Sequence, residues 1–443
     1  MTIAARSPAL DVSEQPTRIR WRIVALIVLI STVTYLDRVN VSIAAAQIMH
    51  EHGLSPAAMG RVFSAFILAY ALFQLPGGWL GDRFGPRLTL GVAILWWSLF
   101  TALTAFATRI APLAWLPPVA ALCIVRFSMG MGEAAAFPNF NRTIANWVAP
   151  QERGFASSLA LAGGGLGACA TPPLIAWMIG AYGWREAFCV CAGLGGVASV
   201  IWISYVRDSA EQHPGVNALE LRTIRGSNTG VALGERTRQR TPWRALLSTR
   251  SVWLLTLLNF ACGYVTYIYL TWFYTYLVQV RWLSVIRGSI YAIGPFLAIT
   301  LMTPLGGAIC DYAARRLGTR LGRMLPGMGG MLIAGMALIA GARTANINYA
   351  IVWLSIGAGA IFVSFAAQCV VTIDICKAHA GVISGIMNFG GNAGGFISPM
   401  LMPFLAQRWG WTPALVSAAA LLLVVSSLWL ILQPERAIEI GTV

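Results

Sequence analysis

Arg126-Phe-Ser-Met-Gly-Met-Gly-Glu133-Ala-Ala-Ala-Phe-Pro138 is the stretch that identifies the class of fold, because it places two charges inside an apolar segment, 113–139. That segment is long enough to cross a bilayer as a helix. About two helical turns separate Arg126 from Glu133, so both side chains lie on one face of the predicted helix, about 10 Å apart. Each charge at membrane depth costs at least about 2.5 kcal/mol on insertion scales, which favours a functional reason for keeping it.

A second pair of charges, Asp37 and Arg38, lies deep in the first apolar segment of the chain. Two acids and two arginines that face a polar cavity indicate a site for an anion and a proton. The competing interpretation is a pair of structural salt bridges that lock helices together. One such clamp needs one pair of charges and not two, which favours the functional interpretation.

The composition identifies a polytopic membrane protein. Of the 443 residues, 57% are hydrophobic and only 11% are charged, whereas soluble domains carry about 25% charged residues. Residues 1–20 are polar and do not resemble a cleavable signal peptide, so the first apolar segment is expected to direct insertion. We predict an all-α fold with twelve transmembrane helices at 21–46, 57–81, 87–109, 113–139, 153–179, 183–206, 251–279, 285–311, 324–342, 346–374, 380–406 and 411–432.

The distribution of basic residues explains the net charge of +15 without a nucleic-acid partner. If both termini lie on one side of the membrane, 22 of the 31 Lys and Arg residues lie on that side and seven lie on the other. The positive-inside rule then predicts a multi-pass protein of the bacterial inner membrane with both termini in the cytoplasm.

The cysteines and histidines predict neither a metal nor a disulfide. All eight cysteines lie within or at the ends of predicted helices, and none forms a ligand-like cluster with the four histidines. We interpret the cysteines as small apolar packing residues. No cofactor is expected.

The second half of the chain repeats features of the first half. Glycine, serine and proline residues of the fifth predicted helix recur 227 residues later, where Gly154, Ser157, Gly163, Gly164, Gly167 and Pro172 match Gly381, Ser384, Gly390, Gly391, Gly394 and Pro399. Six crossings per half give two halves of the same orientation, related by an axis along the membrane normal. The predicted organisation is a cytoplasmic tail (1–20), a six-helix bundle (21–206), a cytoplasmic linker (207–250), a second six-helix bundle (251–432) and a cytoplasmic tail (433–443).

The turn Gly78-Trp-Leu-Gly-Asp82-Arg83-Phe-Gly85-Pro-Arg87 resembles the signature loop of the major facilitator superfamily. Its acidic residue has an echo at Asp311 in the second half. Asp82 is expected to meet a helix N-terminus or an arginine across the interface of the halves and to hold the cytoplasmic side shut. Arg83, Arg87 and Asp311 are the other gating candidates.

Within that superfamily the sequence resembles the anion:cation symporter family. The resemblance is carried by Tyr35-Leu-Asp37-Arg38-Val-Asn40, Phe63-Ser-Ala-Phe66, Tyr70, Gln74-Leu-Pro-Gly-Gly-Trp79, Arg126, Glu133, Phe137-Pro-Asn139 and Asn388-Phe-Gly-Gly. It implies that Arg38 and Arg126 bind a substrate carboxylate and that Asp37 and Glu133 take up the proton. It also implies a polar contact from Asn388 in the other half.

Further polar residues are candidates for the cavity wall. Tyr35 and Tyr70 offer hydroxyl groups, and Tyr264, Tyr267, Thr271 and Tyr274 recur at helical spacing on the seventh predicted helix, although such a stripe also suits packing. Ser364 and Gln368 lie four residues apart on the tenth. Gly164 and Gln368 stand where sugar-acid members carry Gln and Trp, which keeps an aromatic or less hydroxylated carboxylate open as the substrate.

The predicted function is import of a small organic carboxylate, such as an aldonate, aldarate or hexuronate, by proton symport through alternating access. We expect the protein to be a monomer in the bilayer, with transport driven by the proton gradient and no enzyme activity. The alternatives are transport of an aromatic or other non-sugar carboxylate, and an exporter or antiporter of the same fold. A membrane-embedded sensor is a further alternative, but the predicted tails are too short for a signalling domain.

Overall fold

The computed structural model describes residues 15–225, 243–376 and 380–433, and helices make up most of this part of the chain. In chain order the elements are α1 (Ile19–His52), α2 (Pro56–Phe84), α3 (Pro86–Phe106), η1 (Leu113–Trp115), α4 (Pro118–Glu133), α5 (Ala136–Trp147), α6 (Arg153–Tyr182), α7 (Trp184–Tyr205), η2 (Ala210–Gln212), α8 (Ala218–Arg225), α9 (Trp243–Ser248), α10 (Arg250–Thr271), α11 (Phe273–Thr275), η3 (Tyr276–Val280), α12 (Val285–Arg343), α13 (Ile347–Ile375), α14 (Ala380–Trp409), α15 (Trp411–Ser426) and α16 (Leu428–Ile431). Most of both predicted tails and the middle of the predicted linker lie outside the described residues.

Twelve transmembrane helices can be counted in the described part of the chain. Ten helical stretches are long and apolar enough to cross a membrane, with α4 and α5 together forming one of them. One of the ten, α12, contains two crossings, because Gly318 adopts φ 80° and ψ 168° and interrupts the helix. The 30-residue helix α14 is the remaining crossing. The predicted all-α architecture of twelve crossings is therefore confirmed.

The fourth crossing differs from its predicted range, 113–139. Residues Leu113–Trp115 form a short 3-10 turn, and the helix begins only at Pro118. Proline suits the first position of a helix because its missing N–H would have no partner there. The crossing then continues through α5 to Trp147, with a turn at residues 134–135 between α4 and α5. The apolar pattern alone marked neither end.

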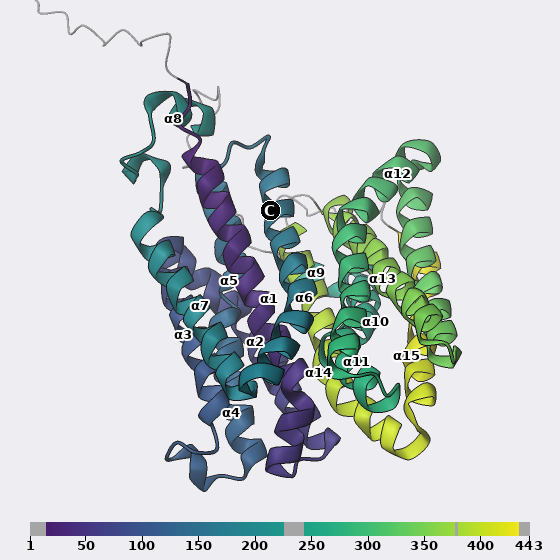
Figure 1. Ribbon diagram of the computed structural model, residues 1–443. Coiled ribbons are helices and arrows are strands. Elements are labelled where there is room, and N and C mark those ends of the chain that lie inside the picture. The colour runs from purple at the N-terminus through teal and green to yellow at the C-terminus, as the bar shows by residue number, and fades with distance from the viewer. Residues whose placement is uncertain (1–14, 226–242, 377–379, 434–443) are drawn as a thin grey trace, which may run out of the picture.

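The helices form two groups, as Figure 1 shows: α1–α7 in purple to teal, and α10–α15 in green to yellow. The groups meet mainly where α2 packs on α14 and where α6 packs on α12. In the sequence repeat, α2 corresponds to the first part of α12, and α6 corresponds to α14. The predicted twofold axis therefore maps the α2–α14 contact onto the α12–α6 contact.

Two hydrogen bonds between the groups lie toward one end of the bundle. We call this end the far end; it carries the α1–α2 connection (residues 53–55). The near end carries the start of α1 and α8 (Figure 1). Ser42, in the last third of α1, donates a hydrogen bond to the carbonyl of Thr271 at 2.7 Å. Ser64, in the first third of α2, donates one to the carbonyl of Phe396 at 2.6 Å.

The glycines that recur in the two halves mostly pack helices within each group. A Cβ added at Gly163 would lie 3.0 Å from Cα of Val28 on α1. The equivalent Gly390 would place its Cβ 3.0 Å from the carbonyl carbon of Thr256 on α10. Both values are tighter than ordinary van der Waals contact, so the repeat preserves a close α6–α1 and α14–α10 approach.

Candidate functional site

A buried ion pair joins α1 to the end of α4. Arg38 donates from Nε to Oε1 of Glu133 at 2.8 Å, and its Nη2 binds the same oxygen. Glu133 is fully buried, and its Oε2 has no hydrogen-bond partner. The spacing within the sequence predicted only that Arg126 and Glu133 share one helix face, about 10 Å apart. In the structure the ion-pair partner of Glu133 comes from another helix, 95 residues away.

Arg126 is buried without a carboxylate partner. Its side chain is only 1% exposed, and Nη1 lies 2.9 Å from Sδ of Met129. Its Nε has no hydrogen-bond partner, and among the described residues no acidic side chain lies within ion-pair distance of it. A desolvated guanidinium in this state offers its planar donor fork to an incoming anion.

Aromatic side chains enclose the guanidinium of Arg38. Its Cζ lies 5.0 Å from the ring centroid of Tyr35, 5.4 Å from that of Phe66 and 4.6 Å from that of Tyr70. The Cζ of Arg126 lies 4.8 Å from the same Phe66 ring. The two guanidinium carbons are therefore at most about 10 Å apart, the two Phe66 distances taken together. This compact arrangement keeps two like charges close, stabilised by cation–π contacts.

Asp37 occupies a polar cluster behind this pair. It is fully buried, and neither carboxylate oxygen has a hydrogen-bond partner. Asn40, one turn further along α1, also has both amide atoms unpartnered, as does Oγ of Ser98 on α3. Glu133 and Arg126 both act on Asp37 electrostatically. Two carboxyl groups and two guanidinium groups therefore lie buried in the first group of helices.

The second group of helices contributes Tyr267 from α10. It belongs to the same buried cluster as Phe66 and Tyr70, and its hydroxyl donates a hydrogen bond to Oδ1 of Asn392 on α14 at 3.4 Å. Asn392 was not predicted. Asn388, the predicted residue, lies one helical turn earlier, and Oδ1 of Asn392 is the atom that accepts the hydrogen bond from Tyr267.

The other predicted residues of the second group make contacts within that group, although Oε1 of Gln368 has no hydrogen-bond partner among the described residues. Gln368 is fully buried and donates hydrogen bonds to Oγ of Ser364 at 3.2 Å and to Sγ of Cys262 at 3.4 Å. Tyr274 donates to the carbonyl of Val285 at 3.3 Å. These contacts favour packing for most of the tyrosine stripe, with Tyr267 as the member that reaches the charged site.

Phe66 is the residue whose importance the sequence showed least clearly. It forms the common contact beneath both arginines. Its signal was its place one turn before Tyr70 on the predicted second helix, since side chains four residues apart share a helix face. Nothing in the spacing distinguished it from the many other apolar residues.

The gating candidates pair within their own halves. Asp82 forms an ion pair with Arg142 of α5, and both belong to the first group. This corrects the expectation of a partner across the interface for the conformation described. Backbone N–H of Arg87 donates to Asp208 at 2.9 Å, and Arg83 lies over the rings of Trp79 and Phe84.

Asp311, the residue of the second half that corresponds to Asp82, also pairs within its own half. Arg323 donates to Oδ1 of Asp311 and to Oδ2 of Asp374, at 3.1 Å in both cases. All three residues belong to α12 and α13. Since the halves meet at the far end, the near-end charges are free to make local pairs here.

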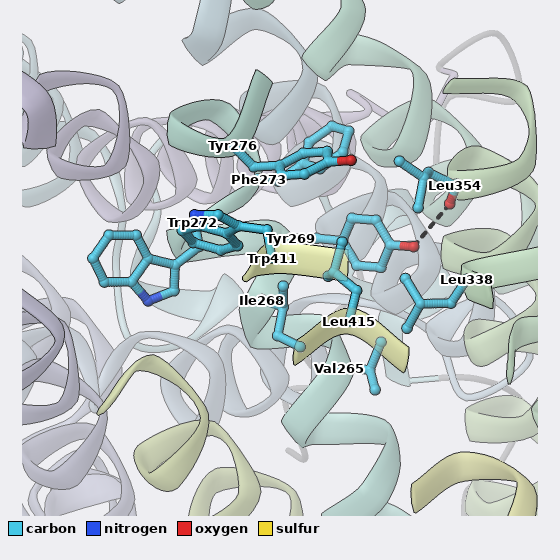
Figure 2. Close-up of a pocket in the computed structure, with 10 residues that line it drawn as sticks. All are labelled: Val265, Ile268, Tyr269, Trp272, Phe273, Tyr276, Leu338, Leu354, Trp411 and Leu415. Carbon is cyan, nitrogen blue, oxygen red and sulfur yellow. Dashed lines mark hydrogen bonds between the residues drawn. The ribbon is translucent and has the colours of Figure 1, made fainter. Parts of the chain in front are cut away.

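The small enclosed void in Figure 2 lies in the second group, away from the charged site. Its volume is about 10 Å³, and its lining is apolar and aromatic, with Trp272, Tyr269 and Trp411 among its walls. A void of that size holds at most about one water molecule. Tyr269 satisfies its hydroxyl by donating to the carbonyl of Leu354 at 2.9 Å. The void is a packing defect and has no room for an organic ligand.

Two helical groups with charges buried at membrane depth define an integral membrane protein of the transporter class. The family model described as Major Facilitator Superfamily matches residues 27–399, so the chain belongs to that family. Its members are transporters, and the expectation of a transporter in place of an enzyme is confirmed.

The chain is similar along its length to several bacterial transporters. It is 34% identical to the "Probable sulfoacetate transporter SauU" of Cupriavidus necator, over 92% of this chain and 93% of that protein. It is 31% identical to the "Probable galactarate/D-glucarate transporter GudP" of Escherichia coli K12, over 98% of both. It is 33% identical to the "D-galactonate transporter" of Escherichia coli O6:H1, over 95% of this chain and 98% of that protein.

A solved structure shares the fold. A bacterial homolog of the human lysosomal transporter Spinster, described as inward-facing and unoccupied, matches with a TM-score of 0.77. The match covers 95% of this chain and 98% of that one at 18% identity. At that identity the likeness supports the arrangement of helices and nothing finer.

Proposed function

We propose that the protein imports a small organic carboxylate by proton symport through alternating access. The observation that carries the proposal is the buried pair of arginines, one bound to Glu133 and the other, Arg126, without an acidic partner. The relatives named for sulfoacetate, galactarate, D-glucarate and D-galactonate all transport small organic anions by their names, which supports an anionic substrate.

Charge balance gives the proposed coupling. With Asp37 and Glu133 ionised, the two acids and two arginines sum to zero charge. A monovalent carboxylate that binds Arg126 leaves the buried site with one excess negative charge, which a low-dielectric interior disfavours strongly. Uptake of one proton restores neutrality. A proton on Glu133 also weakens its bond to Arg38, which then becomes a second donor to the substrate.

Alternating access follows from the two helical groups, 21–206 and 251–432, which we propose move as units about the site between them. The halves are joined at the far end through contacts such as Ser64 to Phe396. The excess of basic residues on one side supports a topology in which the near end and both termini face the cytoplasm of a bacterial inner membrane. On that topology the described conformation is the one closed to the outside.

The aromatic lining supports a second candidate substrate class. Tyr35, Phe66, Tyr70 and Tyr267 surround the charges, and a Cβ at Gly164 would lie 2.7 Å from the ring of Tyr35. The ring therefore packs on bare backbone where sugar-acid members carry a glutamine. An aromatic or sparsely hydroxylated anion suits this wall, as does a compact carboxylate with a sulfonate group. Transport in the export direction is the remaining alternative.

The test is uptake into proteoliposomes that contain the purified monomeric protein and no added cofactor. Labelled sulfoacetate, galactarate, D-galactonate and benzoate are each supplied with an imposed pH gradient, inside alkaline. We expect accumulation of at least one anion above its external concentration, abolished when a protonophore collapses the gradient. If accumulation persists with the protonophore and follows a sodium gradient, sodium and not the proton is the coupling ion. No transport of any anion would reject the proposal.

A further inference from the structure

A groove opens on the outer surface of the bundle at the far end, between α2 and α14. Its volume is about 400 Å³, and it lies beside the seam where the two halves touch. Two residues of α2 and four of α14 line it: Ala57, Arg61, Ile397, Met400, Leu401 and Phe404. Apart from the guanidinium of Arg61, these side chains are apolar.

The groove faces lipid on both of its walls. On α2, Arg61 lies 7 and 11 residues before the exposed Leu68 and Leu72, so the three share one helix face. On α14, Ile397, Leu401 and Phe404 are spaced by four and seven residues and are also exposed, Phe404 by 52%. In a membrane-spanning helix an exposed apolar stripe contacts acyl chains. The groove is therefore a lipid-facing depression that ends in one positive charge.

Arg61 is exposed, about one and a half turns from the start of α2 at Pro56. Among the described residues no acidic side chain lies within ion-pair distance of it. On the same side of the predicted membrane, seven arginines stand against two glutamates, Glu51 and Glu186. Glu51 already binds Arg109 and Arg185. Arg61 thus lacks an acidic partner among the described residues, on a side of the predicted membrane that carries more basic than acidic residues.

We propose that an anionic glycerophospholipid binds here, with its phosphate on Arg61 and an acyl chain in the groove. An arginine near a helix end extends its head toward the headgroup layer, and its donor fork matches a phosphate. A soluble anion would gain nothing from the apolar part of the groove.

The position of the groove gives the lipid a regulatory effect. Gly60, next to Arg61, approaches Pro399 so closely that an added Cβ would lie 2.9 Å from the carbonyl carbon of Pro399. Both walls exist together only while α2 and α14 touch. A lipid that binds both walls stabilises the conformation closed at the far end, by linkage. This inference does not depend on which anion is transported.

Native mass spectrometry of the purified full-length protein tests the site, with phosphatidylglycerol or phosphatidylcholine added in detergent. The parent protein should retain phosphatidylglycerol severalfold better than phosphatidylcholine. Arg61→Gln should lose that preference. Arg287→Gln is the matched control, because Arg287 is an exposed arginine on the same side of the membrane that does not line the groove. It should behave as the parent does.

Leu401→Trp tests the acyl-chain half of the proposal, since a larger side chain fills the groove while Arg61 stays in place. Retention of phosphatidylglycerol should fall in this variant too. Phosphatidylglycerol should also raise the thermal unfolding midpoint of the parent protein more than that of Arg61→Gln. Equal losses in Arg61→Gln and Arg287→Gln would show diffuse attraction to a basic surface and overturn the site. Unchanged retention in Leu401→Trp would overturn the seating of the chain.

Discussion

Replacing Arg126 with alanine tests which buried arginine binds the transported anion. A hydrogen bond to a charged group contributes about 1.5–3 kcal/mol. At about 1.4 kcal/mol for each factor of ten, the loss of one such bond weakens substrate binding by about 10- to 150-fold. Arg126 has no acidic partner in the described structure, so its removal breaks no buried ion pair. We therefore expect Arg126→Ala to fold and to lose substrate binding.

Arg38→Ala is the matched control, because both guanidinium groups lie over the ring of Phe66. Removing Arg38 leaves Glu133 buried without its partner, and breaking a buried ion pair costs about 3–5 kcal/mol. Arg38→Ala should therefore lower the thermal unfolding midpoint well below that of Arg126→Ala. Arg126→Lys should restore binding only in part, since an ammonium group lacks the planar donor fork.

The assay measures binding of the transported anion to detergent-purified protein by isothermal titration calorimetry, with unfolding followed in parallel. The reasoning is refuted if Arg126→Ala binds the anion as tightly as the parent protein does. It is also refuted if Arg126→Ala and Arg38→Ala are destabilised equally, because the two arginines would then both be structural clamps.

Three further predictions concern topology, the linker and the gate. In a cysteine-free background, Arg222→Cys should react with a membrane-impermeant maleimide only from the cytoplasmic side and Trp115→Cys only from the outside, and the reverse pattern would invert the topology. Burial acts to raise the pKa of Glu220, but hydrogen bonds from Thr17 and from backbone N–H groups at the start of α1 hold that pKa below its ordinary value. Glu220 therefore stabilises the fold above about pH 4 and loses this effect as the pH falls through its folded-state pKa. Glu220→Gln should lower the thermal unfolding midpoint at pH 7 and make that midpoint less sensitive to acid. An unchanged midpoint would contradict this prediction. Asp82→Asn breaks an exposed pair worth about 0.2–1 kcal/mol, so we expect slower uptake with stability and substrate binding unchanged, and loss of binding would contradict the gating role.

The architecture could be predicted from the sequence because it depends on the lengths of the apolar segments and on the spacing of the repeat. The length of each apolar segment fixed the number of crossings, and the 227-residue offset predicted two equivalent halves. The break at Gly318 is an instructive exception. The gap between two apolar segments predicted separate helices, whereas the helix runs on to Gly318 and resumes directly after it.

The partners in the site did not follow, because pairing depends on how helices rotate and pack. The spacing of Arg126 and Glu133 correctly placed both on one helix, but the guanidinium that binds Glu133 comes from Arg38 on α1. Similarly, Asn388 and Asn392 lie one turn apart on the same helix. The hydrogen bond of Asn392 to Tyr267 depends on the depth of α14 against α10, which close contacts at glycines determine.

The near-end charges could not be assigned from sequence for a different reason. The carboxylate of Asp82 can accept hydrogen bonds from more than one donor, and which donor it meets depends on which end of the bundle is closed. In the described conformation the far end is closed, and Asp82 pairs with Arg142 of its own half. A single sequence contains no information on which conformation is populated.

Coupling of the proton to the anion is tested most directly by Glu133→Gln in proteoliposomes. Glutamine keeps the shape of the protonated acid and cannot release a proton, so the substrate should still bind and exchange between the two sides of the membrane. Under an imposed pH gradient this variant should equilibrate the labelled anion without accumulating it, while the parent protein accumulates it. If Glu133→Gln concentrates the anion under the gradient as well as the parent does, Glu133 is a structural partner of Arg38 and not the site of proton coupling.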